Sequence, residues 1–145
     1  MSPGDLATLQ KIHDHNQKQI QMGRLAESKG VARGVKELGK RLVQDHMSSD
    51  EKVSALLRER HLDLTALATT TSSDPAHAAA SDKAGSDFDR SFATQVVTDH
   101  MRAIDAIEAA RKSTTDSRLR DFYTALLPVL LGHKQAAQAL GGGAI

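Results

Sequence analysis

The chain has 145 residues, the size of a single domain that can bury one hydrophobic core. Its 19 basic and 18 acidic residues give a net charge of +1, which excludes the strongly basic surface of a nucleic-acid binder. The absence of cysteine excludes disulfides and thiolate chemistry, and an aromatic content of 3% argues against base-stacking surfaces and an aromatic-rich β core.

Two helices are predicted in the N-terminal part of the chain. The first is expected over about 5–28, because Ser2 is a typical N-cap and Pro3 suits the first helical position. Gly30 is typical of a helix end, and the second helix is expected over about 33–60. Apolar residues recur at helical spacing in both, so each helix has one face directed at a core.

The apolar stripe of the first helix is interrupted by an unbroken run of polar residues from His13 to Gln19. This run covers about two helical turns, so some of it must face the core unless the helix bulges toward solvent. We therefore predict that polar side chains among His15, Asn16 and Gln19 enter the core.

A five-residue motif occurs in the middle of two predicted helices. Val-Gln-Asp-His-Met at 43–47 is repeated as Val-Thr-Asp-His-Met at 97–101. In each copy the imidazole, that of His46 or His100, takes a position where the helical spacing requires a core residue. A single core histidine is usually a hydrogen-bonded structural residue, but a second one in a matching position favours a shared polar site.

The second half of the chain is predicted to hold a linker at 61–86 and two further helices at about 87–113 and 116–140. The linker is long enough either to cross the bundle or to form a loop between adjacent helix ends, and a short helix is expected over 76–84. Pro128 is expected to kink the last helix. The whole chain is thus predicted to be one all-α domain, a four-helix bundle.

Each predicted helix carries one inward-facing histidine: His15, His46, His100 and His133. Both helices of an antiparallel pair rise 1.5 Å per residue, and all four histidines lie about 15 to 18 residues from the turn of their pair. We therefore expect them to meet at mid-height of the bundle. There they either bind a metal ion or form a hydrogen-bonded polar layer without metal.

Imidazole ligands favour a transition metal, with zinc as the first expectation and copper or iron as alternatives. Asp50 lies one helical turn after His46 and is a candidate carboxylate ligand. Asp45 and Asp99 point about 100° away from the histidines that follow them and suit outer contacts. The sequence lacks the Glu-x-x-His pairs of di-iron bundles, and this set of side chains identifies no reaction and no catalytic residue.

The order of these features resembles a family of bacterial four-helix domains of unknown function, ferritin-like in fold and often labelled as outer membrane proteins. The resemblance covers nearly the whole chain. It rests on residues 22–26, on the Asp-His motifs at 43–46 and 97–100, and on Leu-Pro at 127–128 followed by His133. It implies a ferritin-like bundle in a periplasmic or cell-envelope setting.

That family carries glutamate in the first helix where this chain has Gln19 and Gln21, which makes His15 or His13 a candidate replacement. The sequence opens on no apolar signal region, and no run approaches the roughly 18 apolar residues of a membrane-spanning helix. An exported protein would carry its signal outside this sequence, and the protein would otherwise be cytoplasmic.

The sequence therefore predicts a metal-binding helical bundle associated with the cell envelope. Two alternatives stay open. One is a structural or interaction module in which the histidine layer only specifies packing, and the other is a redox or hydrolytic metalloenzyme. The expected partner is a metal ion, a homo-oligomer is a further possibility, and no nucleic-acid partner is expected.

Overall fold

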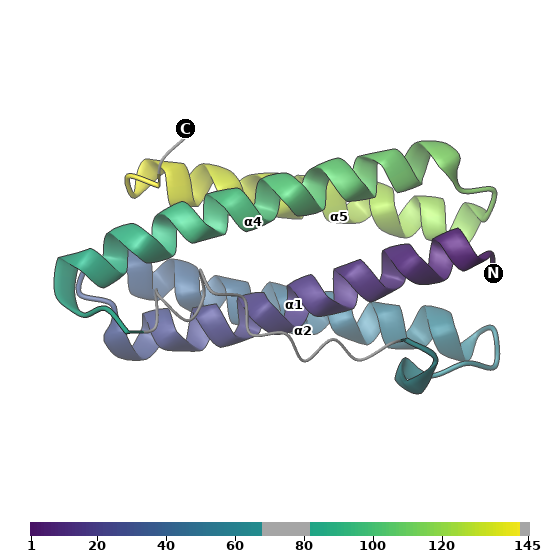
Figure 1. Cartoon of the computed structure of the whole chain (residues 1–145), viewed down its shortest axis with the longest axis horizontal. Helices are drawn as coiled ribbons and strands as arrows, with labels where there is room; N and C mark the ends of the chain where they lie inside the picture. Colours follow the sequence, from purple (N-terminus) through teal and green to yellow (C-terminus); the bar gives the residue numbers. More distant parts are fainter. Residues whose placement is uncertain (68–81, 143–145) are drawn as a thin grey trace.

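The structure is a computed structural model that describes residues 1–67 and 82–142. Within these residues, four long helices form a bundle: α1 (Pro3–Lys29), α2 (Arg33–Arg58), α4 (Gly85–Ser113) and α5 (Ser117–Ala139) (Figure 1). A short 3-10 helix, η1 (Leu64–Ala66), follows α2. The predicted all-α four-helix bundle, with a linker between its second and third long helices, is confirmed. None of the helices described is long and apolar enough to cross a membrane.

The two helical hairpins, α1 with α2 and α4 with α5, pack so that α2 and α4 run parallel (Figure 1). At one end of the bundle, Asp89 of α4 accepts hydrogen bonds from the backbone N–H groups of Val31 and Ala32 in the α1–α2 turn, at 3.0 and 2.8 Å. At the other end, Arg60 forms an ion pair with Asp116 in the α4–α5 turn. The α2–α4 connection therefore joins opposite ends of the bundle, which decides between the two linker geometries that the sequence leaves open.

Local sequence signals position the helix ends. The Ser2 hydroxyl accepts a hydrogen bond from the N–H of Asp5 at 3.0 Å at the start of α1, and the Asp116 carboxylate accepts from the first N–H groups of α5. The last helix continues through Pro128 as one element. The short helix expected at 76–84 falls mostly outside the described residues.

The backbones of α1 and α2 touch at a pair of glycines. A Cβ atom added to Gly23 would lie 2.5 Å from the carbonyl oxygen of Gly39, and one added to Gly39 would lie 2.6 Å from the carbonyl oxygen of Gly23. Any larger side chain at either position would push the helices apart. This contact fixes the spacing of the hairpin a short distance from its turn.

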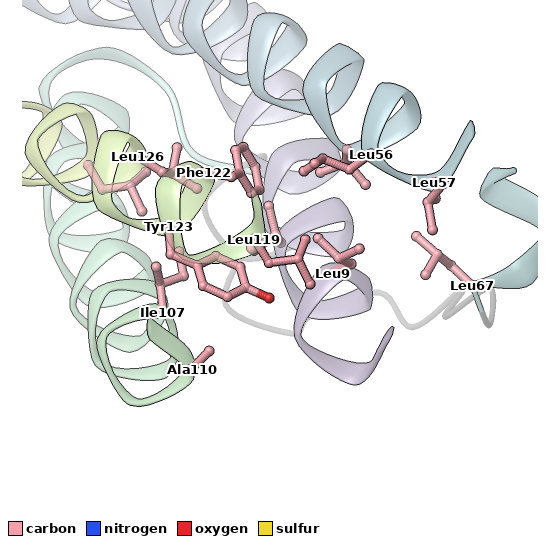
Figure 2. Packing of buried hydrophobic residues seen from close by; sticks show 13 residues of the cluster. Leu9, Leu56, Leu57, Leu67, Ile107, Ala110, Leu119, Phe122, Tyr123 and Leu126 are labelled. Carbon is pink, nitrogen blue, oxygen red and sulfur yellow. The ribbon is translucent and has the colours of Figure 1, made fainter. Parts of the chain in front are cut away.

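The apolar core consists of two clusters separated by a polar layer. Figure 2 shows the first cluster, in which Leu9 of α1 and Leu56 of α2 lie beside Leu119 and Tyr123 of α5, with Ile107 of α4 on the other side of Tyr123. The second cluster surrounds Phe88 and Phe92 at the opposite end of the bundle. The buried side chains between the clusters are polar: Asn16, Gln19, His46, Ser49, Asp99, His100 and His133. Each long helix thus passes from one apolar cluster, through the polar layer, into the other.

Candidate metal centre

Four histidines, one from each long helix, form the centre of the polar layer. The ring centroids of His15 lie 5.0 Å from His46 and 4.9 Å from His100. The ring of His133 lies 5.1 Å from that of His46 and 5.2 Å from that of His100. Rings at these distances are in contact, so the structure brings together the four histidines that were expected to meet at mid-height.

Three of these histidines direct one ligand atom each at a common space. The contributing nitrogens of His15, His46 and His100 all lie within 4.8 Å of one another. The Nδ1 atom of His46 donates to the Oδ1 atom of Asn16 at 2.9 Å, which leaves the lone pair on Nε2. This Nε2 atom is buried and makes no hydrogen bond to any residue that the structure describes. It is therefore a buried nitrogen whose lone pair can bind a cation.

The hydrogen bonds of His100 and His133 leave a lone pair on one further nitrogen of each ring. His100 Nδ1 lies 2.9 Å from the carbonyl oxygen of Val96, and His133 Nε2 lies 2.6 Å from Oδ2 of Asp45. A carbonyl and a carboxylate can only accept, so both of these nitrogens carry the proton of a neutral ring. The remaining atoms, His100 Nε2 and His133 Nδ1, are 3.1 Å apart and face each other with lone pairs. A cation, either a proton or a metal ion, relieves this repulsion.

Burial keeps the rings of His46, His100 and His133 neutral. Desolvation lowers the pKa of His46 and of His100 well below the ordinary value, and repulsion from the neighbouring histidines lowers it further. Burial also lowers the pKa of His133, although the hydrogen bond to Asp45 acts in the opposite direction. Neutral imidazoles are the form that binds metal ions, so the layer presents ligands rather than charges near neutral pH.

Asp50 fixes the orientation of the Asn16 amide, and Asn16 in turn orients the ring of His46. The Nδ2 atom of Asn16 donates to Oδ1 of Asp50 at 3.1 Å, so the amide oxygen of Asn16 is the atom that faces His46. The ring of His13 also contacts Asp50, with Nδ1 2.9 Å from Oδ1. The prediction that Asp50 could be a ligand is therefore wrong for this structure, since its carboxylate is engaged in the outer network. His13 likewise lies outside the layer.

Asp45 and Asp99, which precede the two motif histidines, both accept a hydrogen bond from a side chain of the opposite hairpin. Asp45 of α2 accepts from His133 of α5. Asp99 of α4 accepts from the Nε2 atom of Gln19, on α1, at 2.8 Å and from that of Gln95 at the same distance. The prediction that these carboxylates make outer contacts is confirmed. The Gln19 amide, at the position where glutamate was expected in related proteins, supplies a donor to Asp99 that a glutamate would not.

The sequence matches the family described as DUF4142, a domain of unknown function, over residues 1–140. This chain belongs to the DUF4142 family. None of the curated proteins matches this chain.

Two solved structures have the same fold as this DUF4142 domain. CopM in its Cu(I)-bound form is similar with a TM-score of 0.79 and 15% sequence identity, over 93% of each chain. CopM in its Cu(II)-bound form is similar with a TM-score of 0.78 and 14% identity, over 96% of each chain. At this level of identity the likeness concerns the fold.

Two clefts reach the polar layer of the DUF4142 domain from opposite sides. The α1/α4 cleft, of ≈ 280 Å³, is lined by His15, Asn16 and Asp99, with Leu126 and Leu130 of α5 at its base. The α2/α5 cleft, of ≈ 550 Å³, is lined at the layer by Asp45 and shares Leu126 with the first. Both clefts follow the contacts between the two hairpins. The α1/α4 cleft ends beside Asp99, and the α2/α5 cleft ends beside Asp45.

Proposed function

We propose that this DUF4142 domain binds a copper ion in its polar layer, with His15, His46, His100 and His133 as ligands. The observation that carries the proposal is the 3.1 Å between His100 Nε2 and His133 Nδ1, which both hold lone pairs when the two rings are neutral, together with His46 Nε2, which has no hydrogen-bond partner among the described residues. Buried polar atoms without partners are costly, and a metal ion would satisfy all three.

The donor set fits a metal ion in size. Two ligands at the corners of a tetrahedron are about 3.3 Å apart when each bond is about 2.0 Å, as for nitrogen ligands of zinc. The 3.1 Å between His100 Nε2 and His133 Nδ1 is close to this value. The nitrogens of His15, His46 and His100, which lie within 4.8 Å of one another, would close around the ion by about 1.5 Å at most.

Copper is favoured over zinc by two arguments. A nitrogen site generally binds Cu(II) more tightly than Zn(II), and imidazole is also a good ligand for copper. The similar fold of CopM, which is known in Cu(I)-bound and Cu(II)-bound forms, supports the same choice. The wider expectation of a periplasmic or cell-envelope setting is part of the proposal, and it would be tested by fractionating cells that express the full-length protein.

Metal titrations test the proposal. The purified domain, stripped with a chelator, should bind one copper ion tightly, and His46→Ala and His100→Ala should each weaken binding at least tenfold. His61→Asn is the matched control, because His61 is exposed and lies outside the layer. Asparagine suits its positive φ of 59°. If the unmodified domain binds neither copper nor zinc, the metal proposal fails and a purely structural histidine layer replaces it.

A further inference from the structure

The two clefts are the direct routes from solvent to the histidine layer in the part of the chain that the structure describes. The side chains of His46, His100 and His133 are buried, with at most 1% of each residue exposed. The two apolar clusters close the bundle above and below the layer. Of the clefts along the described residues, the α1/α4 cleft and the α2/α5 cleft are lined by side chains of the layer, and the two differ in charge and in the side chain at their inner end.

The α2/α5 cleft places an exposed carboxylate directly beside one histidine of the layer. The Asp45 side chain is 37% exposed, and its Oδ2 atom lies 2.6 Å from His133 Nε2. The other ring nitrogen of His133 is 3.1 Å from His100 Nε2. A hydrated cation that meets the carboxylate is thus one side chain away from the layer. The carboxylate of the other cleft, Asp99, is only 8% exposed and already accepts from Gln19 and Gln95.

The charges of the two clefts differ in sign. The α2/α5 cleft is lined by three acidic and two basic residues, a net charge of −1: Asp45, Glu59, Asp121, Lys52 and Arg118. The α1/α4 cleft is lined by two acidic and three basic residues, a net charge of +1 with His15 neutral: Asp14, Asp99, Lys11, Lys18 and Arg102. The α1/α4 cleft is thus the more positive of the two, and it remains so when Arg41 beside Asp45 is counted. A more negative cleft concentrates cations, so cations should prefer the α2/α5 cleft.

An arginine occupies the outer side of Asp45. The Nε atom of Arg41 lies 3.6 Å from Asp45 Oδ2, in an exposed pair of the kind that contributes little stability. The same guanidinium lies against α5 at Gly132, where an added Cβ would be 2.9 Å from Nη2. Arg41 therefore covers the carboxylate next to His133 and is a cation that a metal ion can replace at small cost.

We propose, on the basis of the copper site inferred above, that Asp45 is the uptake residue of this centre. A copper ion enters by the α2/α5 cleft, replaces Arg41 at the Asp45 carboxylate and moves past the His133 ring to the histidine nitrogens that face inward. Asp45 thus has two roles, since it also orients the ring of His133 by accepting its hydrogen bond.

The rate of metal association tests this proposal. Stopped-flow mixing of the metal-free domain with Cu(II) should give an association rate about tenfold lower for Asp45→Asn than for the unmodified domain, because the attracting charge is lost. The same substitution in the other cleft, Asp14→Asn, is the matched control and should leave the rate unchanged. Raising the salt concentration should slow the unmodified domain but hardly affect Asp45→Asn. A role of Asp45 in orientation alone would change dissociation and leave this salt dependence intact.

Two further variants locate the route. Ala125→Phe fills the α2/α5 cleft and should slow association, whereas Ala106→Phe fills the α1/α4 cleft and should not. Arg41→Gln should accelerate association. If the domain binds copper and the rate falls with Ala106→Phe instead, or is unchanged by Asp45→Asn, the uptake proposal is overturned while the copper site stands. If equilibrium titration shows no copper binding, the site itself is refuted and the route with it.

Discussion

Acidification should destabilise the metal-free domain, because His46 and His100 are buried as neutral rings. Their pKa values are lowered well below the ordinary value by burial and by the neighbouring imidazoles. In the unfolded chain both rings bind a proton as the pH falls below about 6.5. The stabilising effect of neutral burial is therefore fully present above pH 6.5, and is lost as the pH falls through 6.5 toward the lowered native values.

The size of this effect follows from proton linkage. A ring that stays neutral in the native state and titrates at about 6.5 in the unfolded chain lowers the free energy of unfolding by about 1.4 kcal/mol between pH 7.5 and pH 5.5. The two rings together should lower the free energy of unfolding by about 3 kcal/mol. Urea denaturation followed by circular dichroism, with a chelator present, measures this difference directly.

A variant isolates the contribution of one ring from that of the carboxylates. His46→Gln should lose about half of the pH-dependent drop, whatever its stability at pH 7.5. The reasoning would be refuted if the unmodified domain were equally stable at both pH values, or if His46→Gln showed the full drop. Either result would mean that the rings are protonated in the native state or accessible to water.

Three other substitutions test the packing around the layer. Gly39→Ala should destabilise by about 1–3 kcal/mol, because its Cβ would meet the α1 backbone. Gly4→Ala, whose Cβ would lie 3.8 Å from the Ser2 hydroxyl, should be close to neutral in a thermal melt. Asn16→Ala leaves a buried imidazole N–H without its acceptor and should cost about 1–3 kcal/mol in urea denaturation, and equal stability would argue against the hydrogen bond. Val96→Ala removes fully buried methyl groups and should cost about 1–3 kcal/mol, against less than about 0.5 for the exposed Lys52→Ala, and similar values for both would contradict the assigned faces.

The helices and the polar layer could be predicted from the sequence, because both follow from periodicity along one helix. The imidazoles at apolar positions were enough to place His46, His100 and His133 inside, and the polar run beside Ile12 predicted that some of His15, Asn16 and Gln19 would join them without deciding which. The copper preference could not be predicted, since imidazoles alone suit several metals.

Contacts between helices could not be predicted in the same way. Asp50 shares the inward face of His46, but four residues of helix rise about 6 Å, which brings its carboxylate to Asn16 and His13 instead of to the centre. The pairing of Asp45 with His133 depends on which helix lies beside α2, and that neighbour is set by a connection that crosses the bundle. Periodicity along one helix carries no information about either.

The polar layer also divides the bundle mechanically. The two apolar clusters share no buried residue, and the groups between them are polar, so we expect the two ends to loosen separately. An ion bound by one ligand from each helix would connect both hairpins at mid-height of the bundle. Amide exchange at the two ends would then slow together when the metal binds, because opening of either end would disturb the same four ligands.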